Sequence, residues 1–153
     1  PKIAGYPFTT LEPMLGIAQG PGEATFVVAD IPGLIEGASH GKGLGDKFLK
    51  HVERTRLLLH LVDCGDLPLL PAEEAWRVLR RELAQHAAEL ADRPSLVVAT
   101  KVEDEAARAR AEALATAIGV PVQAISSATG AGLRELVLAV WSMLTALPPA
   151  ATR

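Results

Sequence analysis

The chain has 153 residues, of which 49% are hydrophobic and 22% are charged, and its formal net charge is −3. This is the ordinary composition of one folded domain, and it excludes a disordered, a collagen-like and a membrane-spanning chain. Because acidic residues outnumber basic ones, the chain also lacks the electrostatic footprint of a dedicated nucleic-acid-binding protein.

The first elements in chain order are predicted strands. Residues 14–18 and 25–29 lie on either side of a Gly-Pro-Gly turn, which predicts a hairpin. Residues 57–62 and 96–99 are short continuous apolar runs, typical of parallel strands covered on both faces. Residues 120–125 form a weaker run of the same kind.

Apolar residues at helical spacing predict two helices. One begins after Pro71 and continues through Leu90, and the other runs from about 131 to 147, where two prolines end it. Strands that alternate with helices predict an α/β fold with a mostly parallel sheet flanked by helices, in which ligands bind at the carboxyl ends of the strands. The polar residues expected at these ends are Asp30, Asp63, Thr100, Lys101 and Ser126.

Asp30 and Gly33 frame a D-x-x-G sequence, in which the carboxylate can hold Mg²⁺ through water and the glycine N–H can approach a phosphate. Alone this is a weak motif, but three others accompany it: Phe-Thr-Thr at 8–10, Thr-Lys-Val-Glu at 100–103 and Ser-Ser-Ala at 126–128. Their order and spacing resemble the effector threonine, D-x-x-G, N-K-x-D and S-A-x elements of a P-loop GTPase.

Two longer segments narrow this resemblance to one family. Residues 2–11 (KIAGYPFTTL) and 30–39 (DIPGLIEGAS), the latter continued by GKGLG at 41–45, resemble the two switch regions of Obg GTPases. Residues 48–55 (FLKHVERT) are similar to the helix that follows in these proteins. The related DRG proteins share the glycine-rich switch but differ around Tyr6, so the chain is identified as a member of the Obg family.

The resemblance implies a cytoplasmic protein that binds GTP and GDP, hydrolyses GTP with Mg²⁺ and acts in ribosome assembly and in growth or stress control. It implies contact with the ribosome or a large-subunit precursor and no membrane. Thr10 would bind Mg²⁺ directly and Asp30 through water. The implied nucleotide-binding residues are Phe8, Thr9, Thr10, Leu11, Glu12, Asp30, Ile31, Pro32, Gly33, Thr100, Lys101, Val102, Glu103, Ser126, Ser127 and Ala128.

No catalytic residue is assigned. Leu34 stands where many GTPases carry a glutamine that orients water, and an apolar side chain cannot do this. His40 is interpreted as a solvated loop residue, because a base must be positioned before its pKa matters. The one cysteine, Cys64, has no partner for an internal disulfide; with no N-terminal secretory signal, this agrees with a cytoplasmic location.

The phosphate-binding P-loop, G-x-x-x-x-G-K-[ST], does not occur among the 153 residues. We therefore expect a partial GTPase domain, residues 1–153, that runs from the first switch to the last helix. The P-loop with the first strand and helix, and the Obg N-terminal domain, would be absent, and this segment alone would be inactive. In the family the first strand lies between the strands that end at Asp30 and Asp63, so its removal would expose two strand edges.

The alternative is a pseudo-GTPase or docking module that has lost phosphate binding. It draws on the missing P-loop and on Thr100 and Glu103, which replace the asparagine and aspartate of the usual base-recognition motif. In an active GTPase these replacements predict that guanine is still preferred but that discrimination against adenine is reduced.

Several remaining residues are interpreted as structural. His60 is predicted to be a core or edge residue with its hydrogen bonds satisfied, and Trp76 and Trp141 are predicted to be packing residues. Near the second switch, a solvated basic helix face is favoured over contact with ribosomal RNA. The residues of that face are Lys47, Lys50, Arg54 and Arg56.

Overall fold

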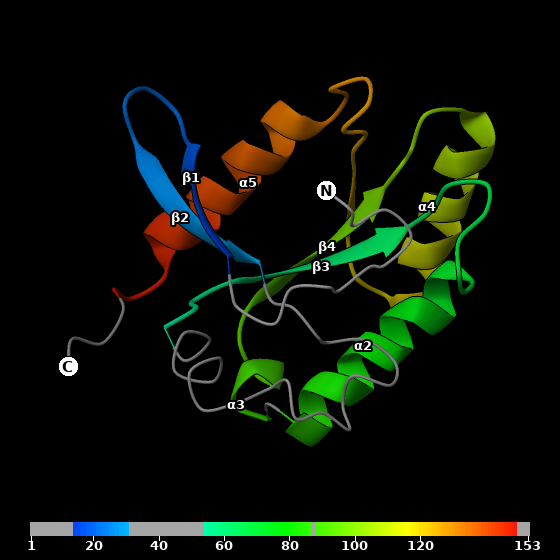
Figure 1. Ribbon diagram of the computed structural model, residues 1–153, viewed down its shortest axis with the longest axis horizontal. Helices are drawn as coiled ribbons and strands as arrows, with labels where there is room; N and C mark the ends of the chain where they lie inside the picture. Colours follow the sequence, from blue (N-terminus) through cyan, green and yellow to red (C-terminus); the bar gives the residue numbers. More distant parts are fainter. Residues whose placement is uncertain (1–13, 31–53, 87, 150–153) are drawn as a thin grey trace.

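The computed structural model describes residues 14–30, 54–86 and 88–149 (Figure 1). Strands and helices alternate after an initial hairpin, as the sequence predicts. The elements are β1 (Met14–Gln19), β2 (Thr25–Asp30), β3 (Leu58–Asp63), α2 (Ala72–His86), α3 (Ala88–Ala91), β4 (Ser95–Thr100), α4 (Glu105–Ile118), β5 (Val122–Ala124) and α5 (Leu133–Ala146). No helix in these ranges has the length and apolar character needed to cross a bilayer.

A parallel three-stranded sheet in the order β3-β4-β5 forms the centre of the described structure. Successive side chains of a strand point to opposite faces, and β4 shows this directly. Val97 and Ala99 pack with α4 and the first turns of α2, whereas Val98 packs with α5 on the other face. Both faces are therefore covered by helices, which confirms the predicted α/β class and explains why the strands read as continuous apolar runs.

The hairpin β1-β2 is a separate two-stranded antiparallel sheet among the described strands. Its turn is closed by a hydrogen bond from the Gly20 N–H to the Ala24 carbonyl at 2.8 Å. The hairpin lies against α5 (Figure 1), where the rings of Phe26 and Trp141 stack with centroids 6.2 Å apart. The described residues thus leave β2 and β3 in different sheets.

The element boundaries differ from the sequence prediction in two places. The helix predicted through Leu90 is divided into α2 and the short α3, and α4 was not predicted at all. The start of α4 carries a clear signal, because the Asp104 carboxylate accepts the Ala107 N–H at 2.8 Å as an N-cap. The alanine-rich sequence that follows has too little apolar contrast for its helical period to stand out.

Candidate nucleotide-base site

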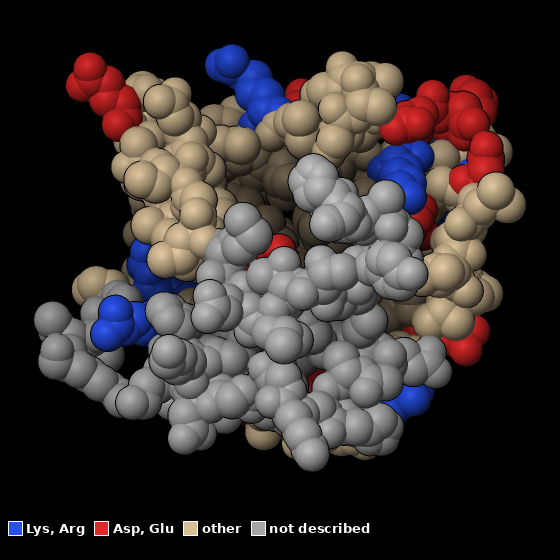
Figure 2. Space-filling view, in the orientation of Figure 1, with Lys and Arg blue, Asp and Glu red and all other residues tan. Residues whose placement is uncertain are grey.

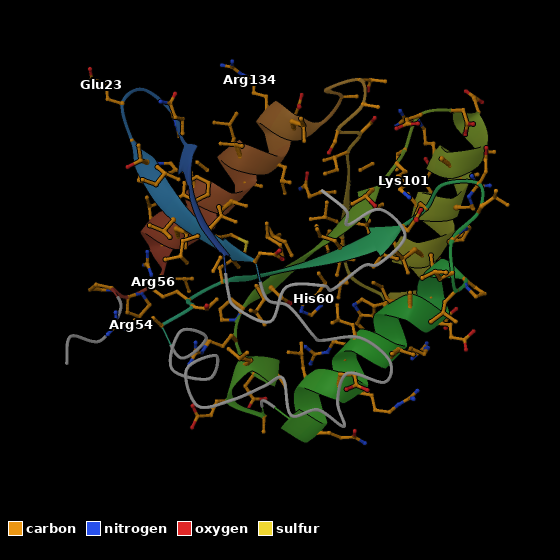
Figure 3. The ribbon with its side chains drawn as sticks, in the orientation of Figure 1. Glu23, Arg54, Arg56, His60, Lys101 and Arg134 are labelled. Carbon is orange, nitrogen blue, oxygen red and sulfur yellow. The ribbon has the colours of Figure 1, made fainter. Side chains whose placement is uncertain are left out.

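The carboxyl ends of β3 and β4 and the loop after β5 meet at one edge of the sheet. β3 and β4 pair with Asp63 opposite Thr100, so Lys101 directly follows the paired region. Figure 3 shows Lys101 beside the end of β3. Two backbone bonds join the loops, from the Cys64 N–H to the Thr100 carbonyl at 3.1 Å and from the Val102 N–H to the Ile125 carbonyl at 3.0 Å. The strand register and these bonds fix the relative positions of the site's side chains.

Asp63 and Lys101 form an ion pair at this edge. The Lys101 Nζ lies 3.0 Å from Asp63 Oδ2, and the Gly65 N–H donates to Asp63 Oδ1 at 2.8 Å. Burial raises the pKa of Asp63, but the Gly65 N–H, the Lys101 ammonium and the Arg110 guanidinium together bring that pKa below its usual value. Asp63 is therefore a carboxylate, accepting from both partners, at neutral pH.

Glu103 and Ser126 form the second pair of the site. The Ser126 hydroxyl donates to Glu103 Oε2 at 2.8 Å, and the Ser126 Oγ accepts the Thr129 N–H at 3.1 Å. Ser126 is completely buried, and its backbone is held by hydrogen bonds to Gly130 and Ala131. The carboxylate of Glu103 is thus oriented by a rigid partner, while Glu103 itself is exposed to solvent.

The remaining residues of the two base-side motifs have different environments. The Thr100 hydroxyl donates to the Val62 carbonyl of β3 over a long 3.4 Å, so it braces the neighbouring strand. Val102 is buried in the core beneath the site. Ser127 and Ala128 lie exposed in the turn that follows Ser126. Lys101 and Glu103 therefore present exposed polar groups at this edge, and the buried Ser126 orients Glu103 from behind.

Arg110 anchors the loop after β3, a role that no sequence motif predicts. Its Nε donates to the Cys64 carbonyl at 2.8 Å, and its Nη2 lies 3.1 Å from the Asp66 carboxylate. Arg110 is one of several charged residues on α4, and only the fold brings it to this loop. Figure 2 shows acidic side chains gathered where α4 begins, at the edge of this site.

Of the residues predicted to contact the phosphates and Mg²⁺, Asp30 alone lies within the described ranges. Asp30 ends β2 and is exposed, in the sheet formed by the hairpin. The other predicted residues of this side lie outside the described residues: Phe8, Thr9, Thr10, Leu11, Glu12, Ile31, Pro32 and Gly33.

The donor chemistry at Asp30 suits Mg²⁺. Magnesium in phosphate-binding proteins takes one or two carboxylates together with phosphate oxygens and water. A single exposed carboxylate at a strand end matches this, and the described ranges contain no group of three His, Cys, Asp or Glu side chains that could form an all-protein cage.

The residues interpreted as structural include one correction. His60 is buried at 3% exposure, but neither ring nitrogen has a hydrogen-bond partner in the part of the chain that the structure describes, so the predicted satisfaction is wrong. His60 lies on β3, on the side that α2 covers (Figure 3). Burial, and secondarily the charge of Arg80, lowers its pKa from 6.5 to about 4.

The tryptophans and the described part of the basic face have structural contacts. Trp76 packs against the core of α4 and the sheet, and Trp141 stacks on Phe26, which confirms both as packing residues. Arg56 donates to the carbonyls of Leu144 and Pro148, which ties the start of β3 to the end of α5. Arg54 is exposed, whereas Lys47 and Lys50 lie outside the described residues.

The described fold resembles solved GTPase structures. A crystal structure of Era in complex with MgGDPNP and nucleotides of 16S ribosomal RNA superposes with a TM-score of 0.64 and 25% identity, over 95% of this chain and 47% of that one. Era of Aquifex aeolicus bound to GDP·AlF4⁻ superposes with a TM-score of 0.60 at 22% identity, over 93% of this chain and 46% of that one. The fold is thus that of a P-loop GTPase.

Sequence comparison gives the family. The family described as 50S ribosome-binding GTPase matches residues 1–101. GTPase Obg of Syntrophotalea carbinolica is 53% identical over 92% of this chain, and GTPase Obg of Acidithiobacillus ferrooxidans is 49% identical over 99% of it. The chain spans 40% and 42% of the lengths of these two relatives. It therefore belongs to the 50S ribosome-binding GTPase family, with the Obg GTPases as its relatives.

Proposed function

We propose that the intact protein binds GTP and GDP and hydrolyses GTP, as an Obg-type enzyme. The observation that carries this proposal is the joint position of Lys101 and the Glu103–Ser126 pair at the carboxyl ends of the strands, in a chain of this family. A carboxylate accepts hydrogen bonds only. Glu103 therefore suits a base edge with two donors, which guanine presents at N1 and its exocyclic amine and adenine does not.

Lys101 has a second part in this proposal. Its aliphatic stem can lie over the flat base while its ammonium stays solvated and paired. Its side chain is 64% exposed, so the stem is accessible to a ligand at this edge. Glu103 would select the base by its hydrogen bonds, and Lys101 would cover one face of it.

On the phosphate side, we propose that residues 8–12 and 30–33 are the two nucleotide-sensing switches. Thr10 would hold Mg²⁺ directly and Asp30 through a water molecule, and the ion would neutralise charge on the phosphates. The P-loop is proposed to come from sequence outside these 153 residues, so the segment alone would be inactive. Two observations support this: the chain spans about 40% of its relatives, and the described residues place β2 and β3 in different sheets.

We propose slow intrinsic turnover, because Leu34 cannot orient the attacking water. We also propose a cytoplasmic location and an interaction with the ribosome or its large-subunit precursor. The family's description as 50S ribosome-binding GTPases supports the ribosomal partner. Among the structural neighbours, Era was crystallised with a segment of 16S ribosomal RNA.

The test is nucleotide binding by the intact protein, measured by calorimetry with GTP, GDP and ATP, with and without Mg²⁺. Saturable binding that favours guanine is expected. Glu103→Gln keeps the shape but replaces an acceptor with a donor, and should weaken GTP binding about 10- to 100-fold, the value of one charge-assisted hydrogen bond. Glu105→Gln, an exposed neighbour in α4, is the matched control and should change little.

Two results would count against the proposal. If the intact protein binds no guanine nucleotide, the docking-module alternative becomes the better account. If Glu103→Gln binds GTP as tightly as the parent protein, base recognition lies elsewhere.

A further inference from the structure

We propose that Asp63, to which the motifs assign no role, is a positioning residue of the nucleotide site. Its carboxylate holds Lys101 where the lysine stem covers the base. Gly65, which has no side chain, leaves room for the lysine stem and the carboxylate. This inference rests on the proposed function and adds a residue from β3 to a site otherwise built from the β4 and β5 loops.

Lys101 needs an outside partner to be ordered. A lysine side chain has four rotatable bonds and loses much rotamer freedom when it is fixed. Its backbone has φ of 61°, the left-handed region that a non-glycine residue rarely adopts, directly after the last paired residue of β4. The ammonium is then found 3.0 Å from Asp63 Oδ2 on the adjacent strand. The contact spans 38 residues of sequence, so only the β3–β4 register brings these groups together.

Asp63 is itself fixed. Its second oxygen accepts the Gly65 N–H at 2.8 Å, which prevents free rotation of the carboxylate. Both carboxylate oxygens are thus used, one toward its own loop and one toward Lys101. A carboxylate anchored by its own backbone is a better template for a flexible ammonium than one that must be ordered at the same time.

Gly65 is part of the same arrangement. A Cβ at this position would lie 3.1 Å from Asp63 Oδ1 and 3.2 Å from both Cβ and Cδ of Lys101. These contacts are tighter than ordinary van der Waals distances, so a side chain here would displace the lysine stem, the carboxylate or both. The ion pair between Asp63 and Lys101 in this arrangement therefore depends on the absence of a side chain at residue 65.

A purely structural role explains this arrangement less well. The Lys101 side chain is 64% exposed and that of Asp63 is 34% exposed, and ion pairs with this much solvent contribute little to stability. Asp66 and Arg110 form a comparable exposed pair in the same loop, at 3.1 Å. The two pairs differ in that only the first holds a residue of the base-recognition motif.

The experiment is a double-mutant cycle in the intact protein, with Asp63→Asn, Lys101→Met and the double variant, and with Asp66→Asn as the matched control. GTP and GDP affinities and dissociation rates are measured for each variant. Asp63→Asn is expected to weaken GTP and GDP binding equally, by about 2- to 5-fold, mainly through faster dissociation. Lys101→Met should cost at least as much, and adding Asp63→Asn to it should cost nothing further, because Asp63 acts through the lysine.

A role in folding alone predicts a different pattern. Asp63→Asn would then lower the unfolding temperature without nucleotide, and its effect on affinity would persist in the Lys101→Met background. Gly65→Ala provides a second route, since it leaves the charge of Asp63 in place. We expect the same loss of affinity in the parent background and no further loss when Gly65→Ala is added to Lys101→Met. Asp66→Asn should bind both nucleotides as the parent protein does.

The outcomes separate this inference from the proposed function. If the parent protein binds GTP and both Asp63→Asn and Gly65→Ala bind it equally well, Asp63 has no positioning role and the proposed function stands. Additive effects of Asp63→Asn and Lys101→Met also overturn the inference. A parent protein that binds no guanine nucleotide overturns both.

Discussion

The two sheets of this protein are stabilised in different ways. In the three-stranded sheet, β4 is covered on both faces by helices, and its central residues Val97, Val98 and Ala99 are nearly inaccessible to solvent. In the hairpin, Ile17 and Val27 are 75% and 66% exposed, while Phe26 stacks on Trp141 of α5 and packs against the core cluster of Val98, Ile125, Leu136 and Val140. The proposed base side thus lies on strands covered by helices, whereas the hairpin that carries Asp30 leaves much of its apolar surface exposed.

This difference bears on how the two halves would behave during the proposed cycle of GTP binding and hydrolysis. A site on a fully packed sheet keeps its geometry whether or not a ligand is bound. A hairpin with much exposed apolar surface is expected to open at lower free energy than a sheet covered on both faces, as segments that move on ligand binding commonly do. The four predictions below test how far the two halves are independent, from the largest expected effect to the smallest.

The largest effect is expected at Gly132, where the backbone packs directly against the end of β5. Gly132 has φ of 77°, and a Cβ there would lie 2.1 Å from the Ala124 carbonyl oxygen. Gly132→Ala should lower the free energy of unfolding by about 4 kcal/mol, from a left-handed backbone and a forced displacement of β5. Gly130→Ala is the matched control, because Gly130 has φ of 83° with no atom within 4 Å of the added Cβ, and should cost only about 1 to 2 kcal/mol. Equal losses in urea unfolding of the intact protein would show that the Ala124 contact relaxes freely.

The next effect concerns the hairpin. Trp141→Ala removes the ring under Phe26 and should cost about 3 kcal/mol, the low end for a tryptophan because Trp141 is half-buried. Hydrogen exchange should show that β1 and β2 lose protection while β3, β4 and β5 keep theirs. Leu138→Ala, on the same helix at 42% exposure, should cost about 0.5 kcal/mol or less. Uniform loss of protection in both sheets would contradict their independence.

Much of this architecture could be predicted from the sequence, because apolar runs and turn residues are local signals. The five strands and α5 lie within a few residues of their predicted ranges, and the motif residues Thr100 and Lys101 lie at the carboxyl end of β4 as predicted. Helix α4 was missed since its alanines blur the helical period, although Asp104 marked its start. Arg110 could not be predicted at all, because its contact with Cys64 depends on how α4 packs beside β3.

The candidate site shows the same limit. Lys101, Glu103 and Ser126 were identified by motif, but the sequence assigned no role to Asp63. An ion pair between residues 38 positions apart is created by strand pairing, which the sequence predicts only as a general topology. His60 shows the reverse case: its burial was expected, whereas its lack of a hydrogen-bond partner follows from the neighbours that the fold supplies.

A third, pH-dependent effect arises at His60 in the three-stranded sheet. Its pKa is lowered from 6.5 to about 4 in the folded state. The unfolded state therefore takes up this proton first as the pH falls, and stability is lost progressively from about pH 6.5 to about pH 4. The expected loss from this group is about 2 kcal/mol at pH 5 relative to pH 7.

The variant His60→Leu replaces the titrating imidazole with an apolar side chain. Urea unfolding at pH 7 and pH 5 should show a fall in stability for the parent protein that exceeds the fall for His60→Leu by about 2 kcal/mol. If the two proteins lose stability in parallel, protonation of His60 does not oppose folding, and its ring must find a partner in solution.

The smallest effect concerns the departure from the usual base motif. Glu103 is one methylene longer than the usual aspartate, but its carboxylate is already oriented by the Ser126 hydroxyl at 2.8 Å. Thr100 donates its single hydroxyl hydrogen to the Val62 carbonyl of β3 and lacks the side-chain amide of an asparagine. We therefore expect Glu103→Asp combined with Thr100→Asn to raise the ratio of GTP to ATP affinity in the intact protein by about tenfold, or about 1.4 kcal/mol.

The two single variants separate the contributions of the two residues to this ratio. Glu103→Asp changes the group proposed to meet the base edge, and Thr100→Asn changes the side chain that bonds to β3 beneath it. Glu105→Asp is the control for shortening a nearby exposed carboxylate. An unchanged ratio in the double variant would mean that Glu103, held by Ser126, already discriminates as well as the usual pair, and that the rigidity of the base side compensates for the altered motif.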